Sequence, residues 1–184
     1  MRAAANVSGM TTVREVRDEQ TVTRSGEPLP APIDGVMVER LRMHADHRGR
    51  LMPCYDPAHP FWADGPIVWA YNFTVRPGHI KGWGMHKRQV DRYLVLHAAM
   101  RAVLYDARED SPTFGRIHEV HFTPATPGLL RIPTGVWHAD HNWGDFEAMA
   151  VNFPTVAYDP DEPDKYRIDP HSGEIPFDFT LRDY

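Results

Sequence analysis

The sequence predicts an all-β fold formed by one domain. Short runs of apolar residues alternate with polar ones at a period of two, and Gly, Pro and Asp separate those runs. No long stretch shows the 3.6-residue period of an amphipathic helix. A chain of 184 residues can bury a substantial core but is short for two domains of ordinary size. Many short strands at this spacing favour a sandwich or a barrel.

Along the chain, three regions differ in character. Residues 1–34 are polar and weakly periodic, so we expect an N-terminal arm. Residues 35–184 are expected to form the barrel. Its last part, from Tyr158, contains Asp-Pro, Glu-Pro and Ile-Pro steps that restrain the backbone to extended or turn conformations. We expect this Pro-rich segment to wrap around the barrel rather than to join its sheets.

The clearest expected strand covers residues 67–75. Its odd-numbered residues are all apolar or aromatic and share one face, whereas the other face includes Asn72 and Thr74. Proline and glycine turns bound this run and the others like it. Further expected strands lie at 92–96, 101–105, 117–123, 129–132 and 146–153.

Composition excludes several functional classes. The net charge of −5 provides no overall basic field, so we expect no nucleic-acid partner. No apolar run approaches the roughly 18 residues of a membrane helix, and the first 30 residues lack the apolar middle of a secretory signal. We therefore expect a cytoplasmic protein without a membrane partner. Cys54 is the single cysteine, which excludes an internal disulfide framework, while the 11 histidines direct attention to acid–base chemistry.

Two motifs resemble those of the cupins. Residues 132–142 read Ile-Pro-Thr-Gly-Val-Trp-His-Ala-Asp-His-Asn and are similar to the second cupin motif, P-x-G-x-x-H-x-x-x-N. Residues 84–98 resemble the first, H-x-H-x4-E-x6-G, with Gly84, Asp91 and Ala98 in place of its first histidine, its glutamate and its glycine. The motifs stand in the right order and separation. This resemblance implies a cupin-type double-stranded β-helix, or jelly-roll barrel.

A narrower resemblance covers residues 35–179. Five segments resemble the dTDP-4-dehydrorhamnose 3,5-epimerase family, in the family's order. They are Asp-His-Arg-Gly at 46–49, Ile-Lys-Gly-Trp-Gly-Met-His at 80–86, Leu-Tyr-Asp-Ala-Arg with Ser-Pro-Thr-Phe-Gly at 104–115, Ile-Pro-Thr-Gly-Val-Trp-His at 132–138, and Tyr-Asp-Pro at 158–160. The resemblance implies an isomerase that inverts C3, C5 or both in a nucleotide-linked 4-keto-6-deoxy sugar. It also implies a homodimer that needs no cofactor.

Catalytic roles follow from this resemblance. The family uses a histidine base, which falls on His86 if one residue is inserted and on Gly84 if none is. Asp91 is the carboxylate that would orient His86. The family's acid, a tyrosine, falls on Asn152, which cannot donate a proton in that role. Tyr158, Tyr93 or Tyr71 is left to replace it; otherwise water returns the proton, or only one centre is inverted. Of the three we select Tyr158.

The resemblance also implies residues that bind the substrate. Arg48 and Lys81 are the first candidates for the diphosphate, because guanidinium and ammonium groups bind phosphate oxygens. Arg76 and Arg88 are secondary candidates. The remaining expected substrate-binding residues are Tyr71, Asn72, Trp83, His138 and Asn152.

Two alternatives of other functional classes remain. His86, Asp91 and His138 form a two-histidine, one-carboxylate set of the kind that holds a divalent metal ion in oxygenases and metal-assisted isomerases. Alternatively, Gly84 and Asn152 indicate a cupin that binds a sugar nucleotide without catalysis. Elemental analysis of the purified protein distinguishes the metal-dependent cupin from the other two. Proton exchange in D2O distinguishes an epimerase from a binder.

Overall fold

The computed structural model describes residues 17–18, 20–26, 29 and 31–181. The chain divides into two compact units, residues 1–31 and 32–184. Most of the expected N-terminal arm lies outside the described residues. Within its described part, the backbone N–H of Leu29 donates to the carbonyl of Thr21 at 2.7 Å, and Gly26 N donates to Thr23 O at 3.0 Å.

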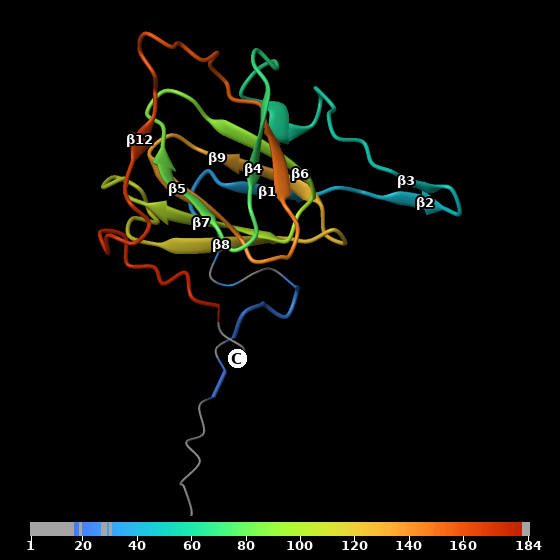
Figure 1. Ribbon diagram of the computed structural model, residues 1–184, viewed down its shortest axis with the longest axis horizontal. Helices are drawn as coiled ribbons and strands as arrows, with labels where there is room; N and C mark the ends of the chain where they lie inside the picture. Colours follow the sequence, from blue (N-terminus) through green and yellow to red (C-terminus); the bar gives the residue numbers. More distant parts are fainter. Residues whose placement is uncertain (1–16, 19, 27–28, 30, 182–184) are drawn as a thin grey trace, which may run out of the picture. The chain divides into compact units, whose positions relative to one another are not determined.

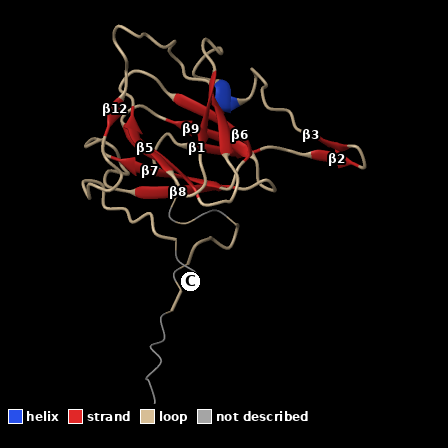
Figure 2. Cartoon of the chain, in the orientation of Figure 1, coloured by secondary structure: helices blue, strands red, loops and turns tan. Residues whose placement is uncertain are grey.

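The second unit contains two five-stranded antiparallel sheets (Figure 1), which confirms the all-β prediction. Among the described residues the helical structure is one 3₁₀ turn, η1 (Pro60–Trp62), shown in blue in Figure 2. The first sheet has the order β1 (Met37–Arg40), β9 (Gly128–Ile132), β6 (Asp91–His97), β11 (Ala148–Asn152) and β4 (Tyr71–Val75). The second has the order β12 (Tyr166–Arg167), β5 (Ile80–Met85), β10 (Val136–Asn142), β7 (Met100–Asp106) and β8 (Ile117–Phe122).

The topology is that of a double-stranded β-helix. Eight consecutive strands, β4 to β11, are shared between the sheets as β4-β11-β6-β9 and β5-β10-β7-β8. The chain therefore crosses from one sheet to the other at almost every connection, as in a jelly roll. A separate hairpin of β2 (His44–Asp46) and β3 (Gly49–Leu51) extends away from the two sheets in Figure 1.

Each expected strand range overlaps an observed strand, whereas β1, β2, β3, β5, β10 and β12 lie outside the expected ranges. The run at 67–75 is a strand only from Tyr71, and residues 67–70 are exposed without regular structure. Alternation in the sequence did not reveal β5, because Gly82 and Gly84 interrupt its apolar pattern. At Gly82 a Cβ atom would lie 2.5 Å from the Cα of Ala139 in the neighbouring strand, so the close approach of β5 to β10 requires glycine there.

Buried residues on the inner face of β6 change from polar to apolar along the strand. On β6, Asp91, Tyr93 and Val95 share the inner face, because alternate residues of a strand point to the same side. Val95 belongs to the main apolar cluster, whereas Asp91 is 2% exposed and charged. The other large, fully buried side chains of that cluster are Ile33, Met100, Leu104, Phe122, Leu130, Ile132 and Val136. One end of the space between the sheets is therefore a packed core, and the other is a polar site.

Part of the C-terminal segment joins a sheet, contrary to the expectation that it only wraps. β12 pairs with β5 at the sheet edge, and Ile168 exchanges backbone hydrogen bonds of 3.0 and 3.2 Å with Trp83. Farther along, Phe177 and Phe179 pack against the Trp83 ring at centroid distances of 6.3 and 5.5 Å. The segment thereby covers β5, the strand that leads into the polar site.

The Ser-Pro-Thr-Phe-Gly motif is a structural turn. Asp106, fully buried at the end of β7, accepts hydrogen bonds from Arg108 Nε at 2.8 Å and from the hydroxyls of Ser111 and Thr113, both at 2.6 Å. Burial alone would raise the pKa of Asp106, but these donors hold it far below its usual value. The ionised carboxylate thus organises the turn between β7 and β8.

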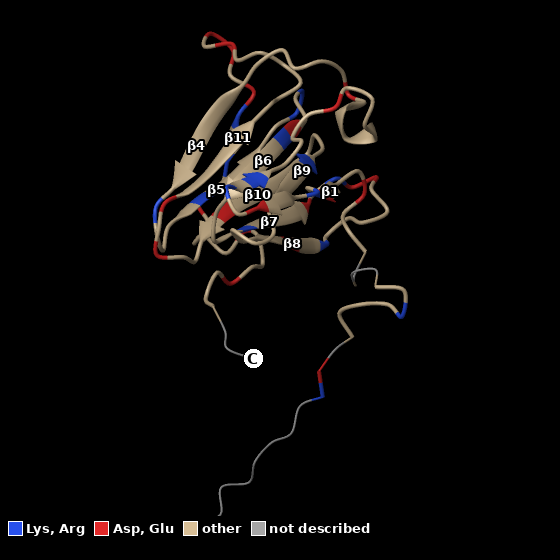
Figure 3. Cartoon of the chain, turned by 90° about the vertical axis from the view of Figure 1, so that its right-hand side faces the viewer, with Lys and Arg blue, Asp and Glu red and all other residues tan. Residues whose placement is uncertain are grey.

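Across the described chain, no helix has the length and apolar character needed to cross a bilayer. Basic and acidic residues are interspersed along the ribbon in Figure 3, in keeping with the net charge of −5.

Candidate active site

The polar end of the space between the sheets contains a cavity lined by both sheets. β6 and β10 provide Asp91, Tyr93, His138 and Asp140, and β4 provides Tyr71. Lys81, Gly84, His86, Lys165 and Arg167 complete most of the remaining wall. Tyr71, His86 and Lys165 also line a second cavity farther out, so the two cavities share a wall. The outer cavity has a volume of about 590 Å³, within the usual range of about 300–1,000 Å³ for small-molecule sites.

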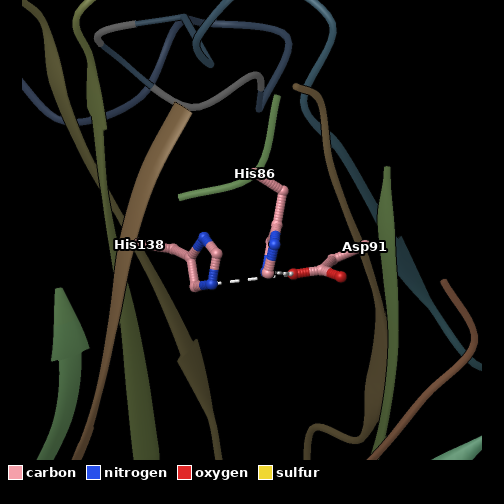
Figure 4. A group of neighbouring side chains, drawn as sticks. All are labelled: His86, Asp91 and His138. Atoms are coloured by element: carbon pink, nitrogen blue, oxygen red, sulfur yellow. Dashed lines mark ion pairs between the residues drawn. The ribbon is translucent and has the colours of Figure 1, made fainter. Parts of the chain in front are cut away.

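Two histidines share one buried carboxylate in the inner cavity (Figure 4). His86 Nε2 lies 3.3 Å from Asp91 Oδ2, and His138 Nε2 lies 3.6 Å from the same oxygen. The two imidazole rings are stacked, with centroids 5.6 Å apart and planes inclined by 27°. All three side chains are about nine-tenths buried or more. The expected grouping of His86, Asp91 and His138 is therefore present in the structure.

The hydrogen bond made by His86 Nδ1 determines which nitrogen of the ring carries the hydrogen. Nδ1 is hydrogen-bonded to the backbone carbonyl of Asp164. Since a carbonyl oxygen only accepts, Nδ1 carries the hydrogen, and Nε2 is the atom that faces Asp91. In the protonated ring Nε2–H faces the Asp91 carboxylate, which also only accepts; when the ring becomes neutral, the Asp164 carbonyl holds the remaining hydrogen on Nδ1 and Nε2 is the basic atom.

Electrostatics distinguish the two histidines. Burial by itself would lower the pKa of His86, but the hydrogen bond to Asp91 and the charge of that carboxylate outweigh it, and the pKa is raised. Burial likewise opposes ionisation of Asp91, yet the histidines and the Asn152 amide lower its pKa. At His138, burial dominates and lowers the pKa to about 4. At neutral pH the carboxylate of Asp91 thus faces a basic His86 and a neutral His138.

The structure places His86, and not Gly84, beside the carboxylate. Gly84 is the Cα partner of His138 across the β5–β10 pair, and a Cβ atom at Gly84 would lie 3.2 Å from His138 Nε2. The His138 ring therefore occupies the space above Gly84. His86 follows two residues later, beyond the end of β5, and supplies the second imidazole from there.

Asn152 connects Asp91 to Tyr71. Its Nδ2 group donates to Asp91 Oδ1 at 2.8 Å and to the Tyr71 hydroxyl oxygen at 2.9 Å, and its Oδ1 accepts from Arg92 N at 3.0 Å. Because Tyr71 is the acceptor in this hydrogen bond, its own hydroxyl proton is not used there. Burial, then the charge of Asp91, raise the pKa of Tyr71, so the phenol stays protonated at neutral pH.

The tyrosines expected as acids lie in different places. Tyr158 is 58% exposed and lines the outer cavity, not the inner one. Tyr93 lies in the inner cavity at 4% exposure, with its ring edge-on to that of His138. Tyr71 is 40% exposed and borders both cavities. Among the three, Tyr71 combines access from outside with a hydrogen-bond connection to Asp91.

Several residues that were expected to bind the substrate line neither cavity of their own chain. Trp83 is 1% exposed and packs under the C-terminal segment, so its ring has no surface left for a ligand. Asn72 points to the outer face of β4 and donates to Met149 Sδ at 3.6 Å. Arg76 follows β4 and lines neither cavity. Arg48 lies on the β2–β3 hairpin, paired with Asp46 at 2.6 Å. Lys81 and Arg88, by contrast, line the inner and outer cavities respectively.

Asp140, Asp164 and Lys165 belong to the site but were not expected from the sequence. Asp140 is 2% exposed, and its Oδ1 atom has no hydrogen-bond partner among the described residues. Burial, reinforced by the charge of Asp91 and opposed by Lys81, raises its pKa to about 8. Asp140 follows His138 by two residues on the same strand and could have been assigned to the same face. Asp164 and Lys165 come from the distant C-terminal segment, for which no local pattern existed.

Comparison with known proteins identifies similar sequences and folds. A family model described as dTDP-4-dehydrorhamnose 3,5-epimerase matches residues 30–183. The spore coat polysaccharide biosynthesis protein SpsL of Bacillus subtilis is 35% identical over 137 residues, covering 74% of this chain and 89% of that protein. The probable low-salt glycan biosynthesis epimerase Agl13 of Haloferax volcanii is 31% identical over 137 residues, covering 74% and 87%. A dTDP sugar isomerase from Desulfovibrio desulfuricans, 27% identical, has a TM-score of 0.72 and covers 79% of this chain and 91% of that one.

A buried neutral carboxyl at position 140 should make stability fall as pH rises. The folded-state pKa of about 8 lies above that of an unfolded aspartate, so the folded protein keeps a proton that the unfolded chain has lost. Asp140→Asn removes this penalty. Its free energy of unfolding should exceed that of the wild type by an amount that grows about 1.4 kcal/mol per unit between about pH 4 and pH 8. Urea titrations across that range test this, with exposed Asp145→Asn as control; parallel curves for wild type and Asp140→Asn would contradict it.

Proposed function

Because the chain belongs to the dTDP-4-dehydrorhamnose 3,5-epimerase family and is a sugar-nucleotide epimerase, we propose that it inverts C3, C5 or both in a nucleotide-linked 4-keto-6-deoxy sugar. The observation that carries this proposal is the His86–Asp91 pair, whose histidine lines both the inner cavity and the outer cavity of about 590 Å³, which is large enough for a sugar. Two relatives are named for polysaccharide or glycan biosynthesis, which supports a product destined for such a polymer.

His86 is the proposed base. The ketone at C4 makes the neighbouring C–H bonds acidic, since the electrons left behind enter an enolate. Nε2 of neutral His86 takes the proton, and Asp91 stabilises the imidazolium that forms. Since the pKa of His86 is raised, the reactive neutral ring becomes more abundant as pH rises through that pKa, and the rate should increase in the same direction.

Tyr71 is the proposed acid, in place of the Tyr158 selected from the sequence. Inversion requires a proton donor on the opposite face of the sugar from the base. Tyr71 comes from β4 of the first sheet, whereas His86 follows β5 of the second. The hydrogen bond from Asn152 holds the phenol oxygen and leaves its proton for the enolate carbon. Asn152 thus has the role of orienting the Tyr71 hydroxyl.

The outer cavity is the proposed nucleotide site. Trp69 and Tyr158 present exposed aromatic faces there, which can stack on a base. Arg88 and Lys165 line the same cavity and provide positive charge for the diphosphate. Lys165 also borders the inner cavity, so it lies where the diphosphate and the sugar would meet.

We propose that the reaction needs no metal ion. Proton transfer between His86, the sugar and Tyr71 provides all the chemistry that epimerisation requires. The second candidate function is that of a metal-dependent cupin. It is favoured by one observation: His86, Asp91 and His138 offer ligand atoms that all lie within 4.8 Å of one another.

We also propose a homodimer in the cytoplasm. On its own chain Arg48 is 78% exposed on a hairpin that extends from the barrel, and a guanidinium in that position can reach a nucleotide bound to a second copy. Sedimentation equilibrium should give twice the mass of one chain. The mass of a single chain at micromolar concentration would contradict the dimer.

Incubation with a dTDP-4-keto-6-deoxyglucose in D2O tests the epimerase. The wild type should replace the C3 proton, the C5 proton or both with deuterium, seen as loss of their NMR signals. His86→Ala should slow this by about 10²–10⁴-fold, because the base is gone. His171→Ala, which removes an exposed imidazole far along the C-terminal segment, should exchange like the wild type.

The same assay separates the alternatives. Exchange that persists after chelator treatment supports the metal-free reaction, whereas loss that a divalent ion restores identifies the metal-dependent cupin. Binding of the sugar nucleotide without any exchange identifies a non-catalytic binder. Equal exchange by wild type and His86→Ala would show that His86 is not the base.

Tyr71→Phe should separate exchange from inversion. Proton removal and return on the His86 side continue, so deuterium still enters the sugar, but delivery to the opposite face should fall by about 10²-fold. NMR of the same reaction measures both quantities as deuterium content and epimer ratio. Tyr55→Phe, on a distant loop, is the matched control. If Tyr158→Phe loses inversion and Tyr71→Phe does not, Tyr158 is the acid.

A further inference from the structure

We propose that Asp164 is a positioning residue for His86, which rests on the proposed function of His86 as the base. Asp164 lies 78 residues away along the chain, in the segment just before β12. It contacts His86 and the turn that follows it through two different groups. Together these contacts determine where the imidazole stands and which of its nitrogens carries the hydrogen.

The carboxylate of Asp164 holds the backbone after β5. Oδ1 accepts from Lys87 N at 3.0 Å, and Oδ2 accepts from Arg88 N at 2.7 Å and from Gln89 N at 3.0 Å. Three consecutive N–H groups that point at one carboxylate form an anion-binding turn. These hydrogen bonds lower the pKa of Asp164 against the effect of burial, so the group is ionised at neutral pH. The turn that connects His86 to Asp91 is thereby closed on a fixed negative charge.

The backbone carbonyl of Asp164 holds the imidazole itself. It accepts from His86 Nδ1, which leaves Nε2 to face Asp91 Oδ2 at 3.3 Å. Without this acceptor, nothing among the described contacts of His86 prevents the ring from placing its hydrogen on Nε2. In that tautomer the basic nitrogen would be Nδ1, which points away from Asp91. One residue therefore fixes both the position and the tautomer of the ring.

Neighbouring contacts make this arrangement rigid enough to orient a side chain. β12 pairs with β5 immediately after Asp164, and Lys87 Nζ lies 4.5 Å from the centre of the Tyr166 ring. Before Asp164, the carbonyl of Glu162 accepts from Arg88 Nη2 at 2.8 Å. The segment is thus attached to the His86 turn on both sides of Asp164, as expected of a support for a catalytic group.

Two substitutions of Asp164 and one matched control test the inference. Asp164→Ala removes all carboxylate acceptors, and Asp164→Asn keeps one carbonyl oxygen for the turn. Asp161→Asn removes the same charge three residues earlier, at an exposed side chain that lines neither cavity. ¹⁵N NMR of labelled histidine, recorded at increasing pH until the His86 signals stop shifting and the imidazole is neutral, reports the tautomer of His86 without any substrate.

The wild type should show the Nδ1–H form of His86, and Asp164→Ala should show a mixture of both forms. Deuterium exchange should fall by about 10–100-fold in kcat for Asp164→Ala, with partial rescue in Asp164→Asn. Asp161→Asn should match the wild type in both measurements.

Two results would overturn the inference. One is a wild-type His86 in the Nε2–H form. This result comes from the wild type alone, so it does not depend on whether the variants fold. The other is an Asp164→Ala protein with wild-type tautomer and kcat. A loss of kcat accompanied by an unchanged tautomer would also reject positioning, since it indicates general damage. If the wild type exchanges no proton yet the tautomer responds to Asp164, the proposed function fails while the structural role of Asp164 stands.

Discussion

The buried carboxylate of Asp91 is the interaction on which the rest of the site depends. A charge at 2% exposure is strongly destabilising unless it is paired and hydrogen-bonded. Asp91 has such partners on three other elements: His86 after β5, His138 on β10 and Asn152 on β11. Both sheets must therefore adopt their observed register for the carboxylate to be tolerated. The group that orients the His86 imidazole also enforces the geometry that surrounds it.

The Asp91 carboxylate interacts strongly with its neighbours because the barrel interior has a packed apolar end beside the polar one. Val95, two steps from Asp91 along the inner face of β6, lies in a packed cluster that excludes water from one side. On the other side Tyr71 and Lys165 separate the cavity from the larger outer cavity. Charges inside such a partly closed site interact more strongly than in water, and a proton transfer there is less disturbed by solvent. The core thus contributes to chemistry as well as to stability.

Local sequence patterns predicted about half of the strands and singled out His86 and His138, but they did not predict the contacts between strands. Period-two alternation predicted β4, β6 and β7, and the Pro-x-Gly turn predicted the position of His138. The choice between His86 and Gly84 depended on how β5 is aligned with β10, which no local pattern records. Tyr71 was not selected as the acid from the sequence, because the hydrogen bond that orients its hydroxyl comes from Asn152, 81 residues away. Trp83 resembled a ligand-stacking residue only because the sequence did not show that Phe177 and Phe179 cover it.

The glycine at position 84 affects how a site of this kind can be recognised from sequence. The position that holds an imidazole in the related motif is here a bare backbone, and the ring is supplied from two residues farther along the chain. A search that requires histidine at position 84 would miss the imidazole that His86 places beside Asp91.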